Sequence, residues 1–327
     1  MLRSFQYTEK SYLDYAMQSN VFREKENEIV RKYVNSHPIR KDMYNKCPVC
    51  GKNSGSYFYT KWDVDYLCCE QCKSVFAVYD DEVVQEYQKL SELIQLRLES
   101  AYQSQITKSR ANVWEEFLDW ISVRAFRFIR RNRELNIVDV GNRFEGYSEC
   151  IQKADLCGKY DLRSSILRDD SYRVKDGEAD IVFYLDQMQK ESNPKERLEE
   201  LREYLKEDGL LIINTRAGSG FDIITLREHN DKIYPYEHIF LPSVKGLVAL
   251  VEESGYEVLE ITTPGVMDVK YVMDSKDKLD DREGFVQYLL QESNQGILQE
   301  FQRFLQKGCL SSFVCVIARK GKKNEAV

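Results

Sequence analysis

The sequence feature that most constrains the fold of this chain is a short apolar run followed by glycine. Residues 136–147 read Asn-Ile-Val-Asp-Val-Gly-Asn-Arg-Phe-Glu-Gly-Tyr. The run Ile137–Val140 predicts a buried strand with Asp139 near its carboxyl end, Gly141 predicts a turn, and a helical pattern follows Gly146. A strand, a glycine turn and a helix open an α/β sheet, and such sheets bind ligands at the carboxyl ends of their strands.

From residue 135 onward, strand-like and helix-like runs alternate. The predicted strands are 136–140, 159–162, 180–185, 210–214, 257–261 and 313–318. Helical patterns separate them at 144–154, 194–205 and 244–254, and two more lie between 279 and 307. This alternation predicts an α/β fold with a doubly wound, mostly parallel, Rossmann-like sheet.

Four cysteines in two pairs form the strongest local motif. Cys47 and Cys50 make one C-x-x-C pair, and Cys69 and Cys72 make a second after 18 intervening residues. This spacing is typical of a structural zinc site, in which four thiolates leave no open position for chemistry. Using Cys68 in place of Cys69 would give a C-x-x-x-C spacing. A redox pair or metal-free thiols are the alternative.

The N-terminal sequence predicts smaller units ahead of the α/β domain. Residues 1–45 predict a helical arm, residues 46–80 a zinc ribbon and residues 81–134 a helical spacer, and the α/β domain takes residues 135–327. The spacer ends in an arginine-rich stretch, interpreted as a solvated face, with a phosphate-facing surface as the alternative.

Composition excludes several functional classes. The net charge of −7 and the pI near 5.3 argue against a nucleic-acid-binding protein. No apolar run approaches the length of a membrane span, and the N-terminus lacks the apolar segment of a secretory signal. Nine cysteines without such a signal indicate metal or free thiols in a reducing compartment, so we expect a cytoplasmic protein.

Residues 135–320 resemble the class I S-adenosylmethionine-dependent methyltransferases. Asp139 and Gly141 match the family's first motif, and residues 205–213 resemble the approach to its fifth strand. A four-cysteine ribbon before such a domain resembles a subgroup associated with sugar and glycan biosynthesis. The segments that resemble this subgroup are 214–225, 236–246, 263–268 and the closing Leu310-Ser-Ser.

The resemblance implies S-adenosylmethionine as cofactor and a set of residues that contact it: Asp139, Gly141, Gly146 and Asp161. In this set Asp161 is the acid that binds ribose hydroxyls at the end of the second strand. The glycine motif departs from the family pattern, because Arg143 and Glu145 occupy its second and third glycine positions. The subgroup's Glu-His pair after the fourth strand is also missing.

The candidate catalytic residues are Tyr236, Glu237 and His238, in a segment that covers the substrate crevice in this fold. His238 is the predicted general base, because an imidazole titrates near neutrality. The loop with Arg216 and Ser219 is predicted to hold a phosphate or carboxylate of the substrate, or else only to connect two elements.

Two hypotheses follow. The first is methyl transfer to a small molecule such as a sugar or nucleotide-linked sugar, by direct displacement. The second is a catalytically inactive methyltransferase-like scaffold or binding subunit of a biosynthetic complex, which the degenerate glycine motif favours. A homodimer is a further hypothesis, and no membrane partner is expected.

Overall fold

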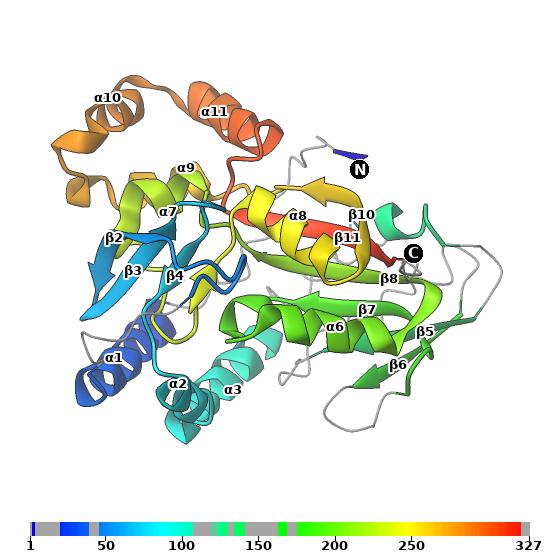
Figure 1. Cartoon of the computed structure of the whole chain (residues 1–327). Coiled ribbons are helices and arrows are strands. Elements are labelled where there is room, and N and C mark those ends of the chain that lie inside the picture. The colour runs from blue at the N-terminus through cyan, green and yellow to red at the C-terminus, as the bar shows by residue number, and fades with distance from the viewer. Residues whose placement is uncertain are drawn as a thin grey trace.

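The computed structural model describes residues 2–3, 20–38, 46–106, 120, 123–129, 134–140, 163–168 and 175–321. Within them, seven strands form one sheet (Figure 1) in the spatial order β1 (Leu2–Arg3), β10 (Tyr256–Thr262), β11 (Phe313–Lys320), β8 (Leu205–Arg216), β7 (Ala179–Leu185), β5 (Glu134–Asp139) and β6 (Arg163–Arg168). Neighbouring strands pair in parallel except β11, which is antiparallel to β10 and β8. The α/β, mostly parallel fold class is confirmed.

Both faces of this sheet are buried. Along β8, Leu211 and Ile213 face one apolar cluster, and Leu210 and Ile212 face another. Helices α6 (Pro194–Tyr204) and α8 (Val244–Glu253) contribute to the first cluster, and residues 123–129 contribute to the second. Strands buried on both faces are apolar at nearly every position. This is why the apolar runs in the sequence were sufficient to predict them.

Local capping sets where several helices begin. The side chain of Asn193 accepts from Glu196 N at the start of α6, whose first residue is proline, and Ser243 accepts from Gly246 N at the start of α8. The described residues also form the α-helices α1 (Asn20–Ser36), α2 (Asp81–Gln88), α3 (Ser91–Ile106), α7 (Phe221–Leu226), α9 (Asp268–Asp274), α10 (Gly284–Glu292) and α11 (Gln295–Lys307).

A second, antiparallel sheet combines two parts of the chain. Its order is β2 (Gly55–Lys61), β3 (Val64–Cys69), β4 (Val75–Ala77) and β9 (Phe240–Leu241). The first three strands belong to the predicted ribbon, and β9 comes from the predicted α/β domain. The ribbon is therefore joined to the rest of the protein by backbone pairing.

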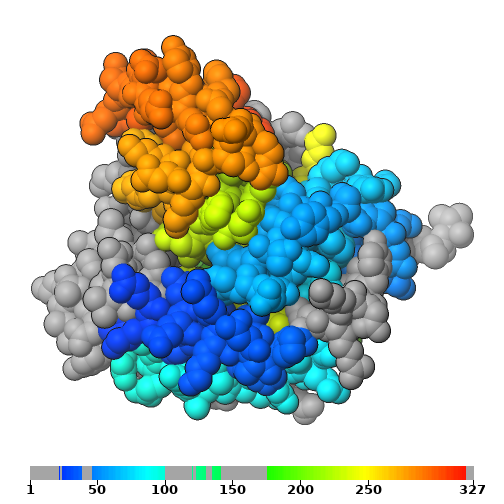
Figure 2. All heavy atoms as spheres, turned by 90° about the vertical axis from the view of Figure 1, so that its left-hand side faces the viewer, coloured from blue at the N-terminus to red at the C-terminus, as the bar shows by residue number. Residues whose placement is uncertain are grey.

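Several layers cover the carboxyl edge of the main sheet. In Figure 1 the carboxyl ends of β7 and β8 point left, where the ribbon sheet, α1, α3 and the helices α9, α10 and α11 lie. Figure 2 views this side, with α10 above, the ribbon in the middle and α1 below. Yellow-green residues near position 225 are visible between α10 and the ribbon.

The strand predictions agree with the structure at β5, β7, β8, β10 and β11. The second strand differs: β6 lies at residues 163–168, whereas the predicted range 159–162 falls outside the described residues. Residues 2–3, inside the predicted helical arm, form β1 and pair with β10. No helix in the described ranges combines the length and apolar character that a membrane crossing requires.

Candidate functional site

The carboxyl ends of β5 and β7 form the switch point of the sheet. The chain leaves β5 for β6 on one side and returns to β7 on the other. Open α/β sheets bind ligands at such a point because the connections diverge there. Asp139, the last residue of β5, is 3% exposed, and Val140 N donates to Phe183 O (3.0 Å) just beyond it. The structure thus places Asp139 at the switch point.

Asp186 follows β7 in a strained backbone conformation. Its φ is 55°, a region that residues other than glycine seldom occupy. Its N–H donates to Asn214 Oδ1 (2.6 Å) and to Asn214 O (3.2 Å), and Gln189 Nε2 donates to Asp186 Oδ1 (2.6 Å). Strain held in place by neighbouring groups is common at ligand-contacting turns. Sequence analysis did not single out Asp186, although it directly follows a buried strand.

Gln189 links the turn after β7 to two other segments. Its side-chain oxygen accepts from Thr215 Oγ1 (2.9 Å) near the end of β8. Its backbone oxygen accepts from Ile239 N (2.9 Å), one residue after His238. Because Gln189 is 1% exposed, water does not compete for these bonds, and the three segments are held in one arrangement.

His238 is held as a neutral hydrogen-bond donor. Its Nδ1 accepts from Tyr234 N (3.1 Å), so the neutral ring carries its hydrogen on Nε2. Burial, and then the charge of Arg216, lower the pKa of His238 to about 3. A buried imidazole with this pKa accepts protons poorly near neutrality. The general-base role stays a prediction, and the geometry favours donation from Nε2 instead.

Glu237 is directed toward the N-terminal helices. Its carboxylate pairs with Arg97 of α3 (3.0 Å) and Lys190 (2.8 Å), and Arg97 also pairs with Glu26 of α1 (2.8 Å). Burial raises the pKa of Glu237, but Arg97 and Lys190 outweigh it and hold the pKa well below its ordinary value. Glu237 is therefore ionised and serves in a buried ion network.

Tyr236 lies in an aromatic cluster. Its ring centroid is 6.1 Å from that of Tyr33 and 6.0 Å from that of Tyr87, both in edge contacts. Its hydroxyl donates to His37 O (3.3 Å), and the residue is fully buried with φ 65°. Tyr236 and Glu237 thus contact the helical layer, away from the partners of the His238 ring. Their predicted catalytic roles remain untested.

The loop after β8 is tightly packed. Arg216 ends β8 half-buried, and its charge acts on both His238 and Asp222. Ser219 Oγ accepts from Val244 N at 3.4 Å. A Cβ added at Gly220 would lie 2.2 Å from Ser312 Cα, so this glycine is needed for close backbone approach. Substrate contact by Arg216 and Ser219 stays a prediction.

A buried carboxyl pair lies beside this loop; its two residues belong to the segments 214–225 and 263–268 that resemble the subgroup, but neither was assigned a role. Asp222 and Asp268 are 0% and 2% exposed. Asp222 Oδ2 accepts from Asn230 Nδ2 (3.0 Å), whereas its Oδ1 has no hydrogen-bond partner among the described residues. Burial and the neighbouring Asp268 raise the pKa of Asp222 to about 7. Asp268 accepts from three groups: Ser311 Oγ (2.7 Å), Gln302 Nε2 (2.7 Å) and Ser312 N (2.6 Å).

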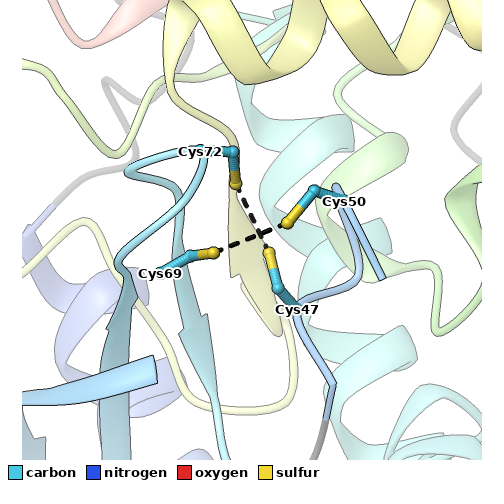
Figure 3. Close-up of side chains that lie close together, drawn as sticks. All are labelled: Cys47, Cys50, Cys69 and Cys72. Carbon is cyan, nitrogen blue, oxygen red and sulfur yellow. Dashed lines mark hydrogen bonds between the residues drawn. The ribbon is translucent and has the colours of Figure 1, made fainter. Parts of the chain in front are cut away.

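The four predicted metal ligands converge on one point (Figure 3). The sulfur atoms of Cys47, Cys50, Cys69 and Cys72 all lie within 4.8 Å of one another, with Cys47–Cys72 at 3.6 Å and Cys50–Cys69 at 3.5 Å. A tetrahedral zinc ion with bonds of about 2.3 Å requires sulfur separations of about 3.8 Å. The donor set therefore fits zinc, and the cluster uses Cys69 rather than Cys68.

Three predicted cofactor residues, Gly141, Gly146 and Asp161, lie outside the described residues, as does Arg143. The position of the predicted ribose-binding acid relative to the second strand nevertheless differs. The resemblance implies an acid at the end of that strand, but β6 ends at Arg168, after Asp161 in the chain. Residues 159–162 were read as this strand because they carry a short apolar pattern, whereas parallel pairing with β5 selects residues 163–168.

Comparisons with known proteins add the following. No protein-family model and no curated protein matches the chain. Among solved structures, phosphoethanolamine N-methyltransferase 2 of Haemonchus contortus with S-adenosyl-L-methionine is 12% identical, covering 62% of this chain and 52% of its own, with a TM-score of 0.38. A SAM-dependent methyltransferase of Thermotoga maritima is 14% identical, covering 65% and 94%, with a TM-score of 0.35.

The [4+2]-cyclase SpnF is similar to the same degree. It is 11% identical, covering 62% of this chain and 80% of its own, with a TM-score of 0.35. All three TM-scores lie below 0.5. The fold assignment rests on the strand order and registers of the sheet itself.

Proposed function

We propose that this protein transfers a methyl group from S-adenosylmethionine to a small molecule, in particular a sugar or nucleotide-linked sugar. The observation that carries the proposal is a buried carboxylate, Asp139, at the switch point of a mostly parallel sheet. An α/β sheet offers its ligand crevice at this point. The resemblance of residues 135–320 to methyltransferases supports the choice of cofactor.

The groups at this edge fit such a cofactor. Asp139 offers a carboxylate at the end of β5, and Asp186 and Asn214 supply polar groups at the ends of β7 and β8. We propose that Asp139, with Gly141 and Gly146, holds the cofactor. When bound, S-adenosylmethionine supplies an electrophilic methyl group on a sulfonium.

The acceptor would be oriented by residues from three segments. His238 presents a neutral ring whose Nε2 carries hydrogen, and Arg216 adds a positive charge near it. Asp186 adds a half-buried carboxylate that accepts hydrogen bonds. Donors together with an anionic acceptor suit the hydroxyl groups of a sugar, and Arg216 suits a phosphate.

The test is calorimetric titration of S-adenosylmethionine and S-adenosylhomocysteine into the zinc-loaded protein. We expect micromolar binding that falls at least tenfold in Asp139→Asn. The matched control is Asp180→Asn, because Asp180 is equally buried but lies near the opposite end of β7, where it accepts from Asn136 N (2.8 Å). The control should bind the cofactor as the wild type does. Equal losses in both variants would contradict a cofactor role for Asp139.

The acceptor is sought by a screen of nucleotide sugars, with formation of S-adenosylhomocysteine as the readout. Turnover that depends on His238 and Arg216 supports the proposal. Absence of cofactor binding in the wild type, with binding gained in Arg143→Gly, would instead favour the scaffold hypothesis. In that case the degenerate glycine motif closes the cofactor site. The cytoplasmic location and the homodimer or complex stay predictions.

A further inference from the structure

The ribbon and the segment that carries His238 share one sheet. Strand β4 of the ribbon pairs with β9 through Val75–Leu241 and Phe76–Phe240, and Ala77 N donates to Ile239 O (2.8 Å). Strand β9 begins two residues after His238. The ribbon therefore supports the backbone on which His238 is placed.

A second contact fixes His238 from the ribbon side. Tyr66 of β3 is fully buried, and its hydroxyl donates to His238 O (3.1 Å). The ring of His238 is held separately by Tyr234 N. Tyr234 also holds the backbone, because its carbonyl oxygen accepts from His238 N (2.9 Å), so Tyr66 is the contact that joins the His238 backbone to the ribbon.

Ser74 connects this segment to the metal ligands. Its Oγ lies 3.2 Å from Cys72 Sγ and accepts from Ser243 N (2.9 Å). In addition, Ser243 Oγ donates to Cys72 O (2.5 Å) and accepts from Gly246 N (2.9 Å) as the cap of α8. Ser74 and Ser243 are 0% and 4% exposed, so water does not replace these bonds.

The donor and acceptor capacity of a serine hydroxyl decides which group donates in each of these hydrogen bonds. A serine hydroxyl has one hydrogen and two lone pairs. With a lone pair of Ser74 taken by Ser243 N–H, its hydrogen is available to a sulfur acceptor. As a thiol, Cys72 donates to the second lone pair of Ser74 Oγ. A cysteine that binds a metal is a thiolate and accepts instead, so metal binding reverses this bond and gives the Ser74 hydrogen an acceptor.

We propose that Ser74 is a positioning residue that couples metal binding at the four-cysteine cluster to the segment 238–246. Metal binding orders the Cys72 thiolate, Ser74 accepts from Ser243 N–H while donating to that thiolate, and the cap of α8 and strand β9 are thereby held. Groups that hydrogen-bond to metal ligands commonly set both metal affinity and ligand orientation. This coupling does not depend on the proposed function.

The close packing at Gly246 supports the same connection. A Cβ added there would lie 2.8 Å from Ser74 Oγ and 3.1 Å from Val49 Cγ1. The first turn of α8 therefore lies directly against the metal-binding loop, with no room for a water molecule between them.

The test compares Ser74→Ala with Ser54→Ala in the full-length protein. Ser54 is the matched control, because its Oγ lies 3.7 Å from the sulfur of another predicted ligand, Cys69, and among the described residues its side chain makes no hydrogen bond to 238–246. Zinc affinity is measured by competition with a chelator, and backbone hydrogen exchange is measured at residues 238–246 in zinc-loaded protein. Cobalt-loaded protein provides the thiolate-to-metal absorption band.

We expect Ser74→Ala to weaken zinc binding about tenfold and to shift the cobalt band. Exchange of the Ser243 and Gly246 amides should also accelerate at least tenfold, while the Cys69 amide stays protected. Ser54→Ala should leave exchange at 238–246 unchanged. Weaker zinc binding in Ser74→Ala without faster exchange at 243–246 would overturn the coupling, and so would equal acceleration in both variants.

Discussion

Two regions flank the loop after β8, and they are fastened in different ways. On one side the ribbon is joined by strand pairing of β4 with β9 and by the bonds around Ser74, next to the four sulfur atoms. On the other side lies a cap, defined here as α7, α9, α10 and α11, with its own apolar cluster. Asp268 of this cap accepts from Ser311 Oγ and Ser312 N just before β11, and Asp222 lies buried beside it.

We expect the two kinds of attachment to make the stability of each region depend on a different solution condition, metal for one and pH for the other. We propose that the four clustered sulfur atoms make the stability of the ribbon side depend on metal. Burial and the neighbouring Asp268 disfavour the ionised form of Asp222, so the stability of the cap side depends on protons. Each of the following tests removes one attachment and asks whether the other region is affected.

Loss of the metal should have the largest effect. Structural zinc contributes on the order of 10 kcal/mol in small metal-binding domains, so chelation or Cys69→Ser should unfold the ribbon and lower the melting temperature sharply. Differential scanning calorimetry with and without zinc measures this effect. Cys68→Ser is the control, because Cys68 is outside the cluster and should leave the transition unchanged. A similar loss in both variants would show that the sulfur cluster does not hold a metal.

Acid should destabilise the His238 segment. The folded pKa of His238 is about 3 against an ordinary value of 6.5, so its contribution to stability is present above pH 6.5 and is lost as the pH falls toward 3. The slope approaches about 1.4 kcal/mol per pH unit. Urea unfolding of zinc-loaded protein between pH 5 and 8 measures it.

His238→Gln should remove this slope, since glutamine can accept from Tyr234 N without titrating. Exposed His229 is the control, and His229→Gln should keep the slope of the wild type. If the His238→Gln protein retained the full acid slope, another group would be responsible and the neutral state inferred for His238 would be wrong.

The cap should show the opposite pH dependence. The pKa of Asp222 is about 7 in the folded protein against an ordinary 3.8, so the folded state holds a proton that the unfolded state releases. Its contribution is fully present below pH 3.8 and is lost as the pH rises to about 7. This pKa difference corresponds to about 4 kcal/mol in the free energy of unfolding. The loss is smaller when the surroundings of Asp268 rearrange as Asp222 ionises.

Asp222→Asn should abolish this loss and make the protein more stable than the wild type at pH 8, as measured by urea unfolding. Its amide oxygen can still accept from Asn230 Nδ2. Asp277→Asn, at an exposed position, serves as the control and should change little. A destabilised Asp222→Asn at pH 8 would mean that Asp222 is ionised and paired at that pH, against the arrangement described.

Part of this architecture could be predicted from local patterns. The runs 180–185 and 313–318 are apolar enough to be recognised as strands, and the cysteine spacing was sufficient to predict which four sulfur atoms meet. The second strand was misplaced because a short apolar pattern at 159–162 does not reveal its pairing partner. Adjacency in the chain also does not reveal contacts: Tyr236 packs against Tyr33 and Tyr87, Glu237 pairs with Arg97 and Lys190, and the His238 ring accepts from Tyr234 N.

The sequence by itself determined the alternation of strands and helices, the apolar runs of the sheet and the cysteine spacing, because these depend on residues close together in the chain. Only the tertiary structure decided the tautomer of His238, the pairing of Asp222 with Asp268 and the bonds of Ser74 to Cys72 and Ser243. These features depend on burial and on partners far away in the sequence, such as Ser243 for Ser74. Hydrogen-bond geometry and desolvation exist only once those partners are brought together.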